Sequence, residues 1–192
     1  GAVVSNIVRY SELGVAAVIG TTGWYSEMDR VVSIVEESGI GLIWSGNFSL
    51  GVNLFFQMIA SAGEVMNRFS QYDVMVHEQH HKNKIDSPSG TAEMIGKILI
   101  DALDRKNAIV TTALNRQIGM HELHISSTRG GSIPGTHQVI FDSDVDTIVL
   151  KHTARSRSGF AEGAVLAAEW IQGKRGLYHI NEMMHSIIRG RK

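Results

Sequence analysis

Three histidines stand within five residues, from His77 to His81, in the stretch HEQHH, and Lys82 and Lys84 follow them. A histidine exchanges a proton near neutral pH, and a ring nitrogen of its neutral form binds metal ions. The stretch also contains the pattern H-E-x-x-H, which on a helix places two histidines on one face to bind zinc beside a glutamate base. The cluster therefore points either to proton transfer or to a zinc hydrolase that uses His77 and His81.

The residues around the cluster favour a strand and a loop over the helix that such a zinc site needs. Residues 72–78 are rich in β-forming side chains, and Pro88 and Gly90 follow in a polar stretch. On a strand, His77 and Glu78 would point to opposite faces of the sheet. We therefore expect no metal site, and we expect a cationic loop at a strand end, where α/β proteins build their sites.

A helix start follows this loop in the stretch SPSGTAE. Ser89 or Thr91 is expected to cap the helix, which we expect over residues 91–104, and the backbone N–H groups of Gly90 and Thr91 should point outward. A helix N-terminus attracts carboxylate or phosphate groups. Taken alone, an ordinary cap is an equally good interpretation. Together with the histidines and Lys84, however, it predicts a pocket for a small anionic substrate whose chemistry involves proton transfer.

The elements that must position this loop indicate an α/β fold of two parts. The first third alternates apolar strands at 15–20 and 40–45 with a helix at 25–39, for which Ser26 is the expected N-cap and Gly39 the stop. A long helix with apolar residues up to Phe69 follows. This pattern predicts a partial Rossmann-type parallel sheet.

From about residue 108 to 152 the pattern consists mostly of strands separated by turn-forming residues, which predicts a mixed, largely antiparallel sheet. With the helices before it, this sheet would form a second α+β domain. The chain end returns to helix at 159–173 and again after Asn181, the expected N-cap. We expect boundaries at 1–49 for the first part, 50–157 for the second, and 158–192 for helices that return to the first.

The composition narrows the partners of this chain. Eighteen Lys and Arg residues against 19 Asp and Glu residues give a net charge of −1, which provides no broad electrostatic footprint for nucleic acid or an anionic membrane. The absence of cysteine excludes disulfides, thiolate zinc sites and a cysteine nucleophile. No apolar run is long enough to cross a membrane, and we expect a cytoplasmic protein.

The stretch HEQHHKNKIDSPSGTA resembles the signature of the dihydrodipicolinate reductase family, E-x-H-H-x-x-K-x-D-x-P-S-G-T-A, at every fixed position. The segments VIGTTGW, GNFSLGVN, IPGTHQVIF and SRSGFAEGAVLAAEWI resemble that family in the same order, so the similarity covers nearly the whole chain. The resemblance implies reduction of dihydrodipicolinate, formed from 4-hydroxy-tetrahydrodipicolinate, to tetrahydrodipicolinate with NADH or NADPH, in the route to diaminopimelate and lysine.

The resemblance also assigns roles to residues. It implies that His80 and Lys84 are the catalytic pair, without deciding which one gives the proton. It implies that His81, Ser89, Gly90 and Thr91 hold the substrate's carboxylates. Two loops match the family's nicotinamide side and follow predicted parallel strands: Gly20, Thr21 and Thr22, and Gly46, Asn47, Phe48 and Ser49. Arg129 would either meet an anion or lie at the surface.

One departure from the family pattern leaves alternatives open. The sequence holds no G-x-x-G-x-x-G after an N-terminal strand, so we expect the first half of the cofactor domain to be missing and this fragment to be inactive without it. The resemblance implies that residues 1–49 are the remainder of the nucleotide-binding domain, to which 158–192 return, and that 50–157 form the substrate-binding and oligomerisation domain. It also implies a homotetramer assembled through the sheet of this second domain. The rival interpretations are a non-catalytic substrate and assembly module and, with less support, the zinc hydrolase.

Overall fold

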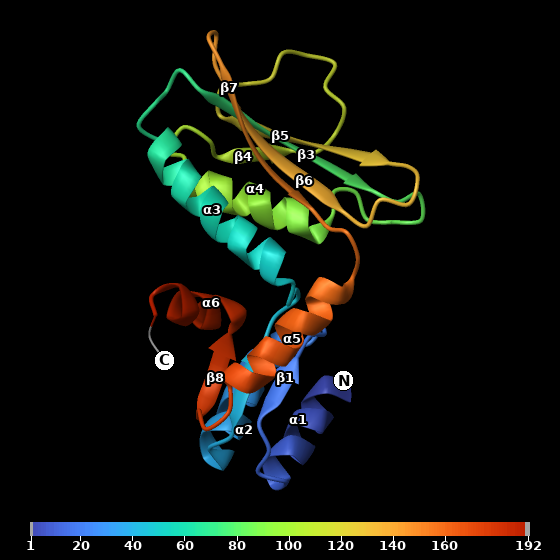
Figure 1. Ribbon diagram of the computed structural model, residues 1–192, viewed down its shortest axis with the longest axis vertical. Helices are drawn as coiled ribbons and strands as arrows, with labels where there is room; N and C mark the ends of the chain where they lie inside the picture. The colour runs from blue at the N-terminus through green and yellow to red at the C-terminus, as the bar shows by residue number, and fades with distance from the viewer. Residues whose placement is uncertain (1, 191–192) are drawn as a thin grey trace. The chain divides into compact units, whose positions relative to one another are not determined.

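The computed structural model describes residues 2–190 and divides them into two compact units (Figure 1). The first unit contains the chain up to Asn53 together with the chain from Ser158 onward. The second unit contains Leu54–Arg157. The chain therefore leaves the first unit once, builds the second as a continuous segment and returns.

The first unit is a three-stranded parallel sheet with the order β1-β2-β8. Helices from the beginning of the chain cover one face of this sheet, and helices from the end of the chain cover the other face. Its elements are α1 (Ala2–Glu12), β1 (Ala17–Ile19), the 3-10 turn η1 (Tyr25–Glu27), α2 (Met28–Ser38), β2 (Gly41–Trp44), α5 (Ser158–Trp170), β8 (Gly176–His179) and α6 (Ile180–Ile188).

Alternation along β2 explains why both faces of this sheet are covered. Leu42 is fully buried among residues of α1 and α2, whereas its neighbour Ile43 is fully buried among residues of α5 and α6. Successive side chains of a strand point to opposite faces, so a strand with two apolar neighbours needs a helix layer on each side. The predicted parallel α/β arrangement is confirmed.

The element ends in the first unit correct several details of the sequence prediction. Gly39 ends α2 in the left-handed conformation, as expected, but the N-cap is Glu27 and no side chain, including that of Ser26, caps the helix. Strand β8 was not predicted. Its last residue, His179, caps α6 through a capping box with Glu182, so the prediction of Asn181 as the cap was wrong.

The second unit is a five-stranded mixed sheet with the order β4-β5-β3-β6-β7. Strands β4, β5 and β3 run parallel to one another, β6 runs antiparallel to β3, and β7 runs antiparallel to β6. Helix α3 (Leu50–Met66) leads into the unit and ends three residues before Phe69. The other elements are β3 (Asp73–His80), α4 (Gly90–Ala102), β4 (Ala108–Val110), β5 (Glu122–Arg129), β6 (Thr136–Asp142) and β7 (Thr147–Thr153).

Helices cover only one face of this sheet (Figure 1). Val74 and Val76 of β3 are buried with Ile95 and Leu99 of α4, whereas Met75 between them is 39% exposed. The expected fold class, a parallel α/β sheet joined to a mixed sheet with antiparallel strands, is confirmed. Within residues 2–190, no helix has both the length and the apolar character that crossing a membrane requires.

The approach of α5 to the loop after β2 gives a stability prediction. A Cβ atom on Gly163 would lie 1.7 Å from the carbonyl oxygen of Phe48, so Gly163→Ala must push the loop and helix apart. We expect a loss of about 1–3 kcal/mol in the free energy of unfolding, as for other overpacked sites. Tryptophan fluorescence during urea unfolding measures this, because all three tryptophans lie in the first unit.

Gly159→Ala is the matched control, since it makes the same substitution in the same helix. A Cβ there meets only the Ser49 hydroxyl, at 3.6 Å, an ordinary contact. Equal unfolding midpoints for the two variants would contradict the close approach.

Candidate active site

Strand β3 places Glu78 and His80 on the helix-covered face of the second sheet. Residues two apart on a strand share a face, and Val74 and Val76 fix that face as the apolar one. Glu78 is 0% exposed and His80 is 7% exposed. The strand thus carries two ionisable side chains into the end of a hydrophobic core, where each needs a partner.

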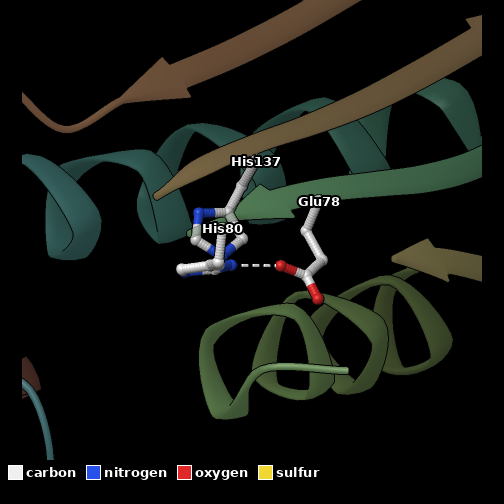
Figure 2. Close-up of side chains that lie close together, drawn as sticks. All are labelled: Glu78, His80 and His137. Atoms are coloured by element: carbon white, nitrogen blue, oxygen red, sulfur yellow. Dashed lines mark hydrogen bonds and ion pairs between the residues drawn. The ribbon is translucent and has the colours of Figure 1, made fainter. Parts of the chain in front are cut away.

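The carboxylate of Glu78 has partners on both oxygens, of which Figure 2 draws the pair with His80. Oε1 accepts hydrogen bonds from Arg129 Nη2 at 2.7 Å and from the backbone N–H of Ser89 at 3.3 Å, and Oε2 pairs with His80 Nδ1. Burial raises the pKa of Glu78, but the hydrogen bonds that it accepts, first of all the one from Arg129, together with the charge of His80 hold the pKa below its usual value. Glu78 is therefore an ionised carboxylate inside the protein.

Two further side chains complete this buried cluster. The His137 ring, from the adjacent strand β6, stands edge-on to the His80 ring with the centroids 5.2 Å apart. His137 Nε2 lies 3.1 Å from Ser89 Oγ, which also accepts the Ala92 N–H and so caps α4. Of the two caps that were predicted, Ser89 and Thr91, the structure has Ser89. Its hydroxyl and its N–H are both turned inward, toward His137 and Glu78.

The helix N-terminus and the loop before it lie next to this cluster. Gly90 is exposed, and a Cβ added there would meet nothing within 4 Å. Lys84 Nζ forms an ion pair of 2.7 Å with Asp86, and its side chain is 23% exposed. The backbone N–H of His81 is fixed by the carbonyl of Ile133 at 2.8 Å.

This arrangement brings the predicted residues His80, His81, Lys84, Ser89, Gly90 and Thr91 onto one strand end, one loop and one helix start. All six belong to the second unit. A small anion at the helix N-terminus would therefore meet both cationic and proton-carrying side chains.

The zinc pattern H-E-x-x-H does not form the site that it predicts on a helix. His77 lies within β3 on the opposite face, where its Nδ1 pairs with Ser126 at 2.8 Å, and His81 lies beyond the strand. In the described residues, one other group has ligand atoms close enough for a metal, Glu78, His80 and His137, all within 4.8 Å. The carboxylate is already shared between the Arg129 cation and His80, so we treat this group as a hydrogen-bonded network.

The partner of Arg129 was not predicted from the sequence. Its side chain is mostly buried and pairs with Glu78, so its anion is an internal carboxylate. No role was predicted for Glu78 from the sequence. The alternation of β3 offered a clue, because Glu78 falls on the same face as Val74 and Val76, where a charge must be paired. The identity of its partner depends on β5, far away in the sequence.

In the first unit, the two predicted cofactor loops follow neighbouring parallel strands. Gly20, Thr21 and Thr22 are exposed after β1, and Gly46 is exposed after β2. The loops touch, since a Cβ on Gly46 would lie 3.4 Å from both Thr22 and Tyr25. Asn47 turns its Oδ1 inward to the Ser49 N–H, while Phe48 and Ser49 are buried. Backbone, the threonine hydroxyls and Tyr25 are thus among the groups that this edge leaves exposed.

Comparisons with known proteins agree with the resemblance seen in the sequence. Residues 51–184 match the family model described as "Dihydrodipicolinate reductase, C-terminus". The 4-hydroxy-tetrahydrodipicolinate reductase of Ralstonia pickettii is 41% identical over 183 residues, which are 93% of this chain and 68% of that protein. The enzyme of the same name from Methanoregula boonei is 37% identical over 186 residues, 95% of this chain and 71% of that protein.

A solved structure shares the fold. Dipicolinate-bound dihydrodipicolinate reductase from Paenisporosarcina sp. TG-14 superimposes with a TM-score of 0.74 at 22% identity, covering 92% of this chain and 67% of that one.

The buried imidazole of His137 gives a pH prediction for stability. Burial, reinforced by the charge of His80, lowers the pKa of His137 to about 4, so the unfolded chain binds this proton more readily than the folded one. Stability from this group is present above about pH 6.5 and is lost as the pH falls toward 4. We expect His137→Asn to remove about 2 kcal/mol of the stability difference between pH 7 and pH 5.

Urea unfolding followed by circular dichroism at the two pH values measures this difference. The control is His121→Asn, at an exposed histidine of the same unit, which should keep the wild-type pH dependence. An unchanged slope in His137→Asn would show that its imidazole titrates normally.

Proposed function

The chain belongs to the dihydrodipicolinate reductase family, and from this membership we propose that it reduces dihydrodipicolinate to tetrahydrodipicolinate with NADH or NADPH. The substrate would arise from 4-hydroxy-tetrahydrodipicolinate, in the route to diaminopimelate and lysine. A biosynthetic step on a small dicarboxylate fits the expected cytoplasmic location. The observation that carries the proposal is the meeting of His80, Lys84 and the α4 N-terminus in one unit.

The substrate would bind through its carboxylates at the start of α4. The N–H groups of Gly90 and Thr91 lie in the first turn, where the helix dipole favours negative charge. The Gly90 N–H hydrogen-bonds the Asp86 carboxylate, which a substrate carboxylate would replace there. His81 and Lys84 add donors beside this turn. Ser89, whose polar groups face inward, would support this pocket by holding the helix end in place.

The proton chemistry would fall to His80 and Lys84. A reduced nicotinamide, when bound, supplies a hydride to the unsaturated ring, and the resulting electron-rich centre must then gain a proton. Burial lowers the pKa of His80, Glu78 raises it, and the cations Lys84 and Arg129 lower it further, so the net effect is a lowering. His80 is then mostly neutral at pH 7, so it would pass a proton to the reduced ring only after its free ring nitrogen has taken one up, as a relay from Lys84 or from solvent.

The exposed edge of the first unit suits a nicotinamide cofactor. Gly20 and Gly46 leave room for close approach of backbone to a flat ring, and Thr21 and Thr22 offer hydroxyls at the carboxyl ends of parallel strands. The buried Phe48 supports this edge, since its ring lies 3.7 Å from the position of a Cβ on Gly20. Asn47, Phe48 and Ser49 would therefore act by shaping the loop.

Substitution of the catalytic pair tests the proposal. In the protein expressed from its complete gene, His80→Gln and Lys84→Ala should each lower turnover by at least about 100-fold, because each removes a proton-transfer group. Oxidation of NADH and NADPH in the presence of 4-hydroxy-tetrahydrodipicolinate gives the rate. Lys97→Ala, in the exposed part of α4, is the control and should keep the wild-type rate. Wild-type turnover in both site variants would contradict the assignment.

The same material separates the rival interpretations. A non-catalytic module would bind dipicolinate weakly in calorimetry and would never oxidise the cofactor. A zinc hydrolase would carry stoichiometric zinc that is lost in His77→Ala.

We also propose that the open face of the second sheet is the contact through which the chain forms a homotetramer. Met75, Ile140 and Val149 pair across three adjacent strands and form an apolar row on the face without helices. Met75 is 39% and Val149 is 48% exposed. Contiguous apolar side chains on an otherwise uncovered sheet are typical of an interface with another protein.

The double substitution Met75→Lys with Val149→Lys should convert the tetramer into smaller species, because like charges would face each other across a symmetric contact. Light scattering coupled to size exclusion measures the mass. Leu13→Lys, at an exposed apolar position of the first unit, should leave the tetramer intact. A tetramer that survives the double substitution would rule out this face.

A further inference from the structure

A carboxylate lies beneath the predicted catalytic histidine without any route to the substrate. Glu78 is fully buried, and both of its oxygens are engaged by protein groups. An ionised carboxylate in a protein core is costly unless it is paired, and removing one partner of such a pair is costly as well. Because burying Glu78 costs free energy and Glu78 does not reach the substrate, we expect a role that it exerts through the residues it contacts.

The pairing fixes the form of the His80 ring. An ionised carboxylate only accepts hydrogen bonds, so His80 Nδ1, which faces Glu78 Oε2, must carry the hydrogen (Figure 2). A neutral imidazole holds one ring hydrogen, and Nε2 is then left with a free lone pair. The hydrogen-bond network therefore selects one tautomer of the histidine.

Within residues 2–190, the His80 ring is hydrogen-bonded through Nδ1, and glycine backbone lies beside Nε2. A Cβ added to Gly135 would lie 3.0 Å from His80 Nε2, so a side chain at this position would crowd the nitrogen. The backbone on either side of His80 is also fixed, since the His80 carbonyl accepts the Gly130 N–H at 3.0 Å and the His81 N–H is bound by Ile133. Both the ring and its carrier strand are thus held in one orientation.

We propose that Glu78 is a positioning residue of the reductase site, which holds His80 in the Nδ1–H tautomer and presents Nε2 to the substrate, with Arg129 as the fixed counterion of the carboxylate. The proposal rests on the proposed function for its catalytic meaning. Carboxylates that orient a reactive or metal-bound histidine through its second nitrogen act by the same physics.

Arg129 is suited to the counterion role by its own bonds. Its Nη2 donates to Glu78 Oε1 and to the carbonyl of Asp86, and its Nη1 donates to the carbonyl of Thr128. The guanidinium thus ties β3, β5 and the substrate loop to one carboxylate. A planar group with several fixed donors can make these bonds at once, whereas a lysine ammonium would lose part of them.

The charged and titratable groups that face His80 are Glu78 on its own strand, Arg129 on β5, His137 on β6 and Lys84 in the loop. Of these, only Glu78 favours the protonated ring. Replacing Glu78 with glutamine should therefore make His80 harder to protonate, moving its titration toward lower pH by about one unit. A glutamine can also either donate to or accept from Nδ1, so the choice of tautomer should be lost.

Nitrogen NMR of the histidine rings tests the proposal in the 192-residue chain without cofactor. His80→Gln assigns the His80 signals. We expect the wild type to show a protonated Nδ1 and a bare Nε2 at pH 7, and Glu78→Gln to show the acid shift and a mixture of tautomers. Glu78→Asp keeps the charge and should restore part of the wild-type behaviour. Glu93→Gln removes an exposed carboxylate of α4 and should change neither signal.

Because Glu78→Gln leaves Arg129 without its partner, the double variant Glu78→Gln with Arg129→Gln is measured as well. It removes both charges and tests the tautomer if the single variant does not fold. In the protein from the complete gene, the pH dependence of kcat should move to lower pH in the glutamine variants, while KM changes little.

Three results would overturn the proposal. These are a wild-type His80 protonated at Nε2, a His80 titration unchanged in the folded glutamine variants, and a stoichiometric metal ion that is lost in His137→Asn. The NMR result does not depend on reductase activity. If the wild type shows the Nδ1–H tautomer but does not reduce dihydrodipicolinate, the proposed function fails and the pairing of Glu78 with His80 stands.

Discussion

A single buried negative charge constrains the arrangement of the second unit. Glu78 lies in the core end of β3, and its neutralisation requires an arginine from β5, a histidine from its own strand and a backbone N–H from the start of α4. These partners come from segments separated by up to 51 residues in sequence. The fold must assemble three elements correctly before the charge is accommodated, so a misassembled unit would leave an ion unpaired in a medium that solvates it poorly.

The residues that satisfy this charge also frame the predicted substrate pocket. Ser89 uses its N–H for Glu78 and its hydroxyl for His137 and the helix cap, and the next N–H of α4, that of Gly90, donates to the Asp86 carboxylate. The N-terminal end of α4 therefore contributes both to the stability of the unit and to the predicted substrate site. In the first unit, Phe48 likewise has two structural roles, because its ring packs in a hydrophobic core and its carbonyl makes the contact with α5.

Local signals in the sequence predicted much of this structure. Glycine at a helix end, serine before a helix and alternating apolar residues act over a few residues, so Gly39, the Ser89 cap and strand β3 could be recognised directly. Features that depend on distant partners could not. Strand β8 is short and only half-buried, and it exists because β2 offers it a parallel partner far earlier in the chain. His179 became the cap of α6 because that strand delivers it there, in place of Asn181.

The same division between local and distant signals applies to the predicted site. The cluster of His80, His81 and Lys84 was visible because its members are neighbours in sequence, and the family signature assigned them roles. The roles proposed for Glu78 and Arg129, and the place of His137 beside them, depend on which strands lie side by side. The order of the strands cannot be read from sequence spacing alone. However, the position of Glu78 on the same strand face as Val74 and Val76 indicated that a buried charge there would need a partner.

The central place of β3 in its sheet also bears on how this family can vary in length. Strand β3 is hydrogen-bonded on both sides, to β5 and to β6, over most of its length. Inserting or deleting one residue in its middle would rotate the following side chains to the other face and exchange Glu78 and His80 for His77 and Gln79. Homologues should therefore accept length changes in the exposed stretch between β4 and β5 and refuse them within this strand. We therefore expect homologues to keep the glutamate and the histidine two residues apart.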